Sequence, residues 1–277
     1  MSHENTPDMQ DAHASSPFDA VLDFVEGVGE KTLGFFASVG RLVEFMAMAL
    51  YHVFVPPYFW KNIGKQMISI GYYSLPVVGM TTLFTGMVLA LQSYTGFTRF
   101  NAESAIAGVV VLSVTRELAP VLAGLMVAGR VGASIAAEIG TMRVTEQIDA
   151  LSTLSVNPFK YLIAPRLLAG TLMLPCLVLV GDIIGVFGGY MVSIYSLGFS
   201  PGSYLSQTWD VLEKMDVISG LIKAAVFGLI VTMMGCYHGY NSGRGAQGVG
   251  SATTNAVVSA SILILIFNYL LTQIFFS

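Results

Sequence analysis

The segment Arg130–Pro158 has the sequence RVGASIAAEIGTMRVTEQIDALSTLSVNP, and it separates two strongly apolar parts of the chain. It is the longest well-charged passage between such parts. Its charged residues are Arg130, Glu138, Arg143, Glu146 and Asp149. Because the flanking sequence reads as membrane, we interpret this segment as the place where a membrane protein meets a water-soluble partner.

The composition of the chain supports a membrane protein. Only 11% of the 277 residues are charged and 54% are hydrophobic, whereas soluble domains carry roughly 25% charged residues. A chain this apolar would expose large apolar patches in water, so lipid must be the solvent for most of it. The fold class we expect is therefore an all-α integral membrane protein. The net charge of −4 argues against a nucleic-acid partner.

The N-terminal quarter, residues 1–66, is expected to be peripheral to the spans. Residues 1–17 are polar and acidic, without the apolar core of a signal peptide, and predict a disordered cytoplasmic tail. Residues 18–66 predict a helix that lies in the membrane interface. Its uncharged run Phe45–Val55 has only 11 residues, and a membrane-spanning helix needs roughly 20.

The remainder, residues 67–277, predicts five spans. We place them at about 70–94, 105–128, 162–195, 217–237 and 255–276. The segments between them are taken as loops, among them 130–158 and the glycine-rich 239–254.

The distribution of lysine and arginine predicts the orientation, because these residues accumulate on the cytoplasmic side. A cytoplasmic N-terminus places nine of them inside and only Arg99 and Lys214 outside. The inner set is Lys31, Arg41, Lys61, Lys65, Arg130, Arg143, Lys160, Arg166 and Arg244. The C-terminus is then periplasmic, and segment 130–158 is cytoplasmic.

Four charged residues fall inside predicted spans: Arg116, Glu117, Asp182 and Lys223. Each costs about 2.5–3.5 kcal/mol at the bilayer centre and needs a partner or water. We expect Glu117 to pair with Lys223, and Arg116 to pair with Asp182 or with a ligand headgroup. Two interpretations stay open: a structural ion-pair network, or the polar part of a cavity for an amphiphilic substrate.

Within segment 130–158, Val144, Ile148 and Leu151 have the spacing of one helix face. A short amphipathic helix between Gly140 and Asn157 follows from this spacing. It is either an interfacial loop helix or a coupling helix that docks into a cytoplasmic motor.

Enzymatic motifs are missing from the sequence. No catalytic Ser/His/Asp set, HExxH motif or paired carboxylates occur at useful spacing, and we expect no metal site. The run Gly27–Thr32 departs from the phosphate-binding loop because Glu30 separates Gly29 from Lys31. We therefore expect a non-catalytic chain without a cofactor of its own.

Three passages carry a family resemblance. They are Ser113–Leu151, Phe84–Tyr94 and Asn157–Arg166, with the pattern REL-P…AGR-G…AEIG-M--TEQ-DAL. The chain resembles the MlaE/YrbE family of ABC-transporter permeases from about Lys31 to its C-terminus.

The resemblance implies a homodimeric permease in the bacterial inner membrane, with five spans and an N-terminal elbow helix parallel to the membrane. It implies a cytoplasmic ABC ATPase that binds ATP and magnesium, and a periplasmic MCE-domain lipid-binding protein. The implied substrate is a phospholipid or related lipid that moves between the inner membrane and this carrier, in support of outer-membrane lipid asymmetry.

The resemblance also implies roles for residues. Arg116, Glu117 and Lys223 would lie at the lipid cavity, with Leu89 and Tyr94 near it. The residues at the ATPase would be Glu138, Arg143, Glu146, Ile148, Asp149 and Leu151. Asp182 matches no part of the family pattern, and we assign it to the cavity on its position alone. The alternative function is an ion-coupled secondary transporter of an amphiphilic substrate, with Glu117 and Asp182 as ion sites.

Overall fold

A computed structural model describes residues 17–100 and 102–276, in which helices and turns occur and strands do not. The predicted tail, residues 1–17, lies outside the described residues except for Pro17. The chain divides into two compact units, one ending at Phe45 and the other beginning at Met46. Helix α1 (Pro17–Phe54) contains this boundary.

The second unit holds the α-helices that follow α1. In chain order they are α2 (Trp60–Ile70), α3 (Leu75–Phe97), α4 (Ile106–Ser113), α5 (Ala119–Val127), α6 (Ala133–Val144), α7 (Gln147–Thr153), α8 (Ala164–Tyr195), α9 (Pro201–Val211), α10 (Lys214–Tyr240) and α11 (Gly245–Phe276). Three π-helical turns continue the helices in the described residues: η4 (Val114–Leu118), η5 (Ala128–Gly132) and η6 (Phe159–Ile163). Short 3₁₀ turns are η1 (Tyr72–Ser74), η2 (Thr98–Phe100) and η3 (Glu103–Ala105).

Six helical stretches of the described residues are long and apolar enough to cross a membrane. Five of them contain the five predicted spans: Trp60–Phe97, Ile106–Val144, Phe159–Tyr195, Lys214–Tyr240 and Gly245–Phe276. The predicted all-α membrane fold is thus confirmed. The sixth stretch is Thr32–Phe54, so the shortness of the uncharged run 45–55 does not exclude a span there. The membrane-parallel placement of this helix stays a prediction.

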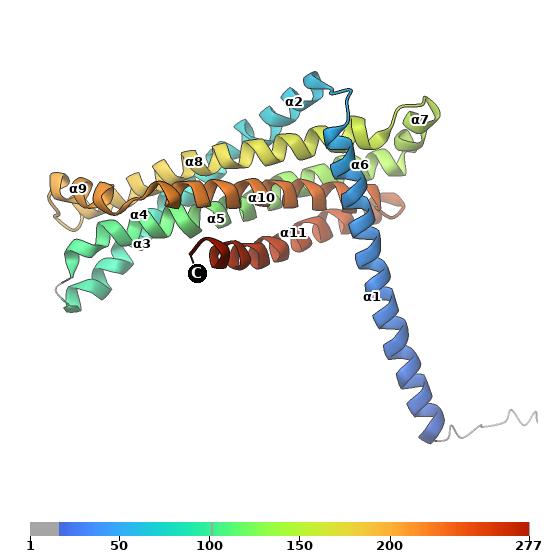
Figure 1. Cartoon of the computed structure of the whole chain (residues 1–277), viewed down its shortest axis with the longest axis horizontal. Coiled ribbons are helices and arrows are strands. Elements are labelled where there is room, and N and C mark those ends of the chain that lie inside the picture. The colour runs from blue at the N-terminus through green and yellow to red at the C-terminus, as the bar shows by residue number, and fades with distance from the viewer. Residues whose placement is uncertain (1–16, 101, 277) are drawn as a thin grey trace, which may run out of the picture. The chain divides into compact units, whose positions relative to one another are not determined.

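Helices α8 and α10 form the centre of the second unit. Helix α8 packs against α2, α3 and α10, and α10 also packs against α6 and α11; α8, α10 and α11 run side by side in Figure 1. The contact between α8 and α10 is close because Gly170 and Gly228 meet there. A Cβ atom on Gly228 would overlap the carbonyl of Gly170. Small residues allow such backbone contacts in membrane bundles.

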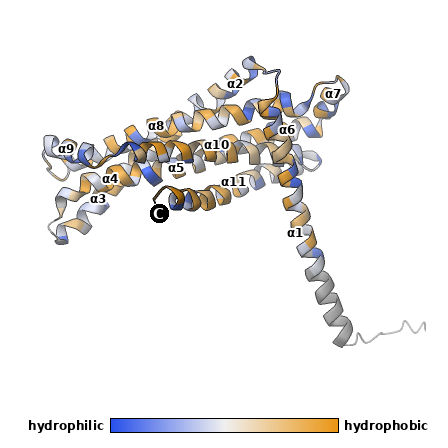
Figure 2. Cartoon of the chain, in the orientation of Figure 1, coloured by the Kyte–Doolittle hydropathy of each residue, from blue (hydrophilic) through white to orange (hydrophobic). Residues whose placement is uncertain are grey.

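Hydrophobic residues dominate the long helices, as Figure 2 shows for α10 and α11, and hydrophilic residues gather at α7. Many large apolar side chains are exposed along α3, α8 and α11. This pattern is expected where lipid surrounds a bundle, because hydrocarbon accepts apolar side chains as readily as a protein core does.

The predicted loop 130–158 is wrong in its first half. Helix continues through η5 and α6 to Val144, and the chain turns only at Thr145 and Glu146. Ile135, Ala136, Ile139 and Gly140 are buried along α6, so this segment is held by packing. Arg130 begins a more polar part of the sequence, but the helix continues past it to Val144.

The glycine-rich loop 239–254 is also mostly helical. Helix α11 begins at Gly245, which leaves a short turn after α10. Ala252, Ala256, Ala260 and Ile264 are buried at helical spacing along α11. The small residues therefore serve helix packing against α10 and α6.

Candidate functional site

The π-helical turn η4 carries Arg116 and Glu117. In this turn the N–H of Ala119 donates to the carbonyl of Val114, five residues before it. The N–H that would normally bind the carbonyl of Arg116 belongs to residue 120, which is a proline and has none. The sequence therefore leaves the carbonyl of Arg116 available to another donor. Single π turns inside α-helices often occur at functional sites.

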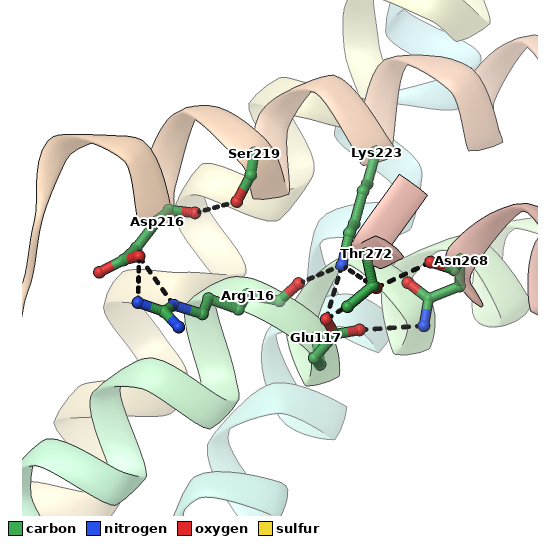
Figure 3. A network of polar contacts seen from close by, with 7 residues as sticks. All are labelled: Arg116, Glu117, Asp216, Ser219, Lys223, Asn268 and Thr272. Atoms are coloured by element: carbon green, nitrogen blue, oxygen red, sulfur yellow. Dashed lines mark hydrogen bonds and ion pairs between the residues drawn. The ribbon is translucent and has the colours of Figure 1, made fainter. Parts of the chain in front are cut away.

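That donor is Lys223 of α10, whose side chain is 0% exposed. Its Nζ donates to the carbonyl of Arg116 at 2.9 Å, to Oε1 of Glu117 at 2.7 Å and to Oγ1 of Thr272 at 2.8 Å. A lysine ammonium has three N–H donors, and all three are used here. Figure 3 shows the Lys223 side chain extending from α10 toward Glu117 on one neighbouring segment and Thr272 on the other. The predicted pairing of Glu117 with Lys223 is confirmed.

Helix α11 completes the surroundings of Glu117. Thr272 donates to Oε1 of Glu117 at 2.9 Å, and Nδ2 of Asn268 donates to Oε2 at 2.9 Å. Sequence analysis missed both residues because they are uncharged and lie in a span. Their spacing of four residues, which puts them on one helix face, is the signal that could have found them.

Arg116 pairs with Asp216 near the start of α10, and the predicted pairing with Asp182 is wrong. Its Nε and Nη2 both lie 2.7 Å from Oδ1 of Asp216, which is buried. Oδ2 of the same carboxylate accepts the backbone N–H of Glu213 at 2.9 Å in a capping box. Asp216 was missed because α10 begins earlier than predicted, at Lys214, which puts this residue in its first turn.

The charges of this network balance, since Arg116 and Lys223 face Asp216 and Glu117. A buried ion pair is retained only where the geometry and additional hydrogen bonds offset the loss of hydration. The two pairs differ in access. The Lys223 side chain is fully buried, whereas the Glu117 side chain is 35% exposed and that of Arg116 is 32% exposed. The edge of the network that another molecule can reach is therefore Glu117 and Arg116.

An apolar groove of about 410 Å³ reaches Leu118, the last residue of η4. It is formed by α3 residues together with Leu118, which follows Glu117 in the chain. The lining residues are Phe84, Thr85, Val88, Leu89, Gln92 and Leu118. Leu89 lines this groove, whereas Tyr94 packs against Phe199, with ring centroids 6.0 Å apart.

Asp182 lies elsewhere, on α8. It is buried and lines a separate cavity with Thr115 of η4, and Glu117 is not among the residues that line it. The structure therefore brings together three of the four charged residues of the predicted spans.

A second polar group lies toward the other ends of the helices. Arg166, which is buried, pairs with Glu138 at 2.9 Å. Arg130 donates to Oγ of Ser74 at 2.7 Å and so connects η5 to the beginning of α3. Arg143 pairs with Asp149 at 2.7 Å, and this pair is exposed.

The turn between α6 and α7 has an unusual backbone. Glu146 has a positive φ of 59°, in the left-handed region that non-glycine residues seldom adopt. It reverses the chain, so that α7 does not extend α6. The predicted stripe of Val144, Ile148 and Leu151 is wrong as a docking ridge: Val144 belongs to α6, and Ile148 is only 1% exposed. The exposed apolar residue after α7 is Leu154, at 73%.

Comparison with known proteins agrees with this architecture. The family model described as Permease MlaE matches residues 63–274. The chain belongs to the MlaE permease family. It is therefore a multi-pass membrane permease, and residues 63–274 include the network, the groove and the α6–α7 turn.

Individual relatives support the family assignment, two of them over 92% of this chain. A "probable ABC transporter permease protein" of Rickettsia bellii is 60% identical over 256 residues, 92% of this chain and 99% of that protein. The "intermembrane phospholipid transport system permease protein MlaE" of Haemophilus influenzae is 35% identical over 264 residues, 92% and 98% of the two chains. A chloroplastic protein of Arabidopsis thaliana, trigalactosyldiacylglycerol 1, is 38% identical over 217 residues, 78% and 62% of the two chains.

Proposed function

We propose that this chain is the membrane subunit of an ABC transporter that moves phospholipid between the inner membrane and a periplasmic MCE-domain carrier. It supports lipid asymmetry of the outer membrane. The substrate class agrees with the name of the Haemophilus relative, which specifies phospholipid transport. The chain itself does no catalysis, and ATP with magnesium binds to a separate ATPase.

The observation that carries this proposal is the apolar groove at Leu89 and Leu118, since Leu118 follows the partly exposed Glu117 in the chain. An acyl chain needs apolar walls, and a charged headgroup needs polar partners at the end of such walls. Arg116 can offer its guanidinium to a phosphate, because this side chain is partly exposed while Asp216 holds it in place. Lys223 holds the Glu117 carboxylate in position through their ion pair.

The ATPase is proposed to dock at α7 and its two cap residues, Glu146 and Leu154. Glu146, Asp149 and Leu154 are exposed there and combine two carboxylates with one large apolar side chain. Ile148 fixes α7 to the bundle, since it is buried. Movement of α7 would therefore be passed to α6 and, through η5, to the helix that carries Arg116.

A homodimer is proposed because one chain leaves wide apolar faces on α3, which forms most of the groove, and on α11. The exposed large residues of α3 and α11 include Val77, Met80, Phe84, Val88, Ile262, Leu265, Ile266 and Tyr269. A second copy against these faces would turn an open groove into an enclosed cavity.

Co-purification tests the ATPase partner. The tagged chain should isolate an ABC ATPase from its own cells, and Leu154→Ser together with Asp149→Ala should reduce the recovered ATPase at least several-fold. Tyr195→Ser, also an exposed side chain but at the other end of α8, is the matched control and should have no effect. Isolation without any ATPase, combined with lipid transport on an ion gradient alone, would establish the secondary transporter instead.

A further inference from the structure

A second cavity, separate from the groove at Glu117, lies beside α8. Its volume is about 550 Å³, within the range of small-molecule sites. It is enclosed by α4, η4, α8, α9 and the beginning of α10, and it shares no lining residue with the groove. Residues of its mainly apolar wall include Val111, Leu179, Ile183, Phe187, Tyr204 and Trp209.

One acidic side chain, Asp182, lines this cavity, and no lysine, arginine or histidine does so. Asp182 is 6% exposed, and neither of its carboxyl oxygens has a hydrogen-bond partner in the described part of the chain. The nearest basic residue along η4, Arg116, is already engaged by Asp216. The cavity thus contains a buried polar group that the protein itself leaves unsatisfied.

The threonine hydroxyls of the wall are directed into their own helices, whereas the buried hydroxyl of Tyr204 has no hydrogen-bond partner in the described residues. Thr115 donates to the carbonyl of Val111 at 2.8 Å, and Thr208 donates to that of Tyr204 at 2.8 Å. An occupant would therefore find the Asp182 carboxyl group and, beside it in the wall, the Tyr204 hydroxyl. Asp182 lies about 20 Å along α8 from Tyr195, the last residue of this helix.

An unpaired polar group in apolar surroundings costs several kcal/mol, and acidic residues inside spans mark ligand or ion sites. We infer that this cavity binds a membrane-soluble molecule with a hydrocarbon body and one hydrogen-bond donor, an alcohol or an amine, which donates to Asp182. Ile183, Phe187 and Trp209 are exposed at the rim of the cavity, so this molecule would enter between them from the bilayer. A phosphate headgroup does not suit the site, because no lysine, arginine or histidine lines it.

Trp209 provides a local reporter of occupancy, since it lines the cavity and Trp60 is the other tryptophan of the chain. In the full-length Trp60→Phe protein in lipid nanodiscs, quenching of Trp209 is measured with a brominated long-chain alcohol, the matched amine and the matched hydrocarbon. The alcohol or the amine should half-quench Trp209 at a concentration about tenfold lower than the hydrocarbon. That factor is what one hydrogen bond to a charged or polar partner contributes.

Asp182→Leu should remove this preference, so that all three probes quench alike. Asp182→Asn keeps an acceptor of the same shape, so binding of an alcohol should persist, whereas preference for an amine should fall. Asp182→Asn also keeps the test interpretable if Asp182→Leu does not fold. Trp209→Phe, which leaves Trp60, reports general partition into the lipid.

Equal quenching by the three probes in the unsubstituted Asp182 protein overturns the inference. So does a preference for the alcohol or amine that survives in Asp182→Leu. The inference is independent of the proposed function, because the readout is occupancy of this cavity and requires neither an ATPase nor lipid transfer.

Discussion

Removal of Glu117 should destabilise the chain more than removal of Lys223. In Glu117→Leu the ammonium of Lys223 remains fully buried with only the Arg116 carbonyl and Thr272 as acceptors. Breaking a buried ion pair in this way costs about 3–5 kcal/mol. In Lys223→Met the Glu117 carboxylate is partly exposed and still accepts from Thr272 and Asn268, so the cost should be about 1.5–3 kcal/mol.

The double variant Glu117→Leu with Lys223→Met should lose much less than the sum of the single variants, because no buried charge is left without a partner. The coupling energy should be about 2 kcal/mol or more. The assay is unfolding in mixed micelles titrated with sodium dodecyl sulfate, followed by helical circular dichroism. The exposed pair Arg143–Asp149, with the same 2.7 Å separation, is the control and should couple by about 1 kcal/mol or less.

Two results would refute this reasoning. One is a coupling energy for Glu117 and Lys223 no larger than that of the exposed pair. The other is a larger loss of stability in Lys223→Met than in Glu117→Leu, since the structure buries the lysine and exposes part of the carboxylate.

Three further predictions use the same unfolding assay. Gly228→Ala should cost about 1–3 kcal/mol because its Cβ overlaps Gly170, whereas Gly250→Ala, with open space around it, should be neutral or stabilising by up to about 1 kcal/mol; equal stability of the two would contradict the close contact. Asp216→Asn should weaken the contact with Arg116 but keep an acceptor for the Glu213 N–H, and Asp216→Ala should cost about 1 kcal/mol more by removing that cap. If the two substitutions at Asp216 cost the same, the capping box does not contribute. Glu146→Gly should be more stable than Glu146→Ala by about 1–2 kcal/mol, since alanine keeps the left-handed strain; an alanine variant as stable as the glycine variant would argue against that backbone.

The spans and one ion pair could be predicted because both follow from the cost of polar groups in hydrocarbon. Long apolar runs identify helices, and an isolated Lys223 and Glu117 in two of them require each other. The partner of Arg116 could not be chosen this way, since two acids, Asp182 and Asp216, were available in the sequence. The spacing of Glu213 and Asp216 predicts a capping box, which places Asp216 in the first turn of α10 and favours it over Asp182 as the partner of Arg116. This signal can be recognised only once the start of α10 is known.

Helix ends were predicted poorly because polarity and helicity are different properties. The charges at Arg130 and Glu138 suggested a loop, yet α6 carries a buried stripe that includes Ile135 and Ile139. The residues of 239–254 suggested flexibility, but in α11 the same small side chains permit close packing. The left-handed turn at Glu146 has no signature in the sequence, because neither glycine nor asparagine occupies it.

The central claim is that this MlaE-family permease moves phospholipid under the control of a separate ATPase. The most direct test reconstitutes the chain with its co-purified ATPase in liposomes and follows transfer of a fluorescent phospholipid to an added MCE-domain carrier. The account predicts transfer that requires ATP hydrolysis, is lost with a hydrolysis-deficient ATPase, and is reduced at least several-fold in Arg116→Ala under conditions where that protein is folded. Transfer that proceeds equally without ATP, or that only an ion gradient drives, would contradict it.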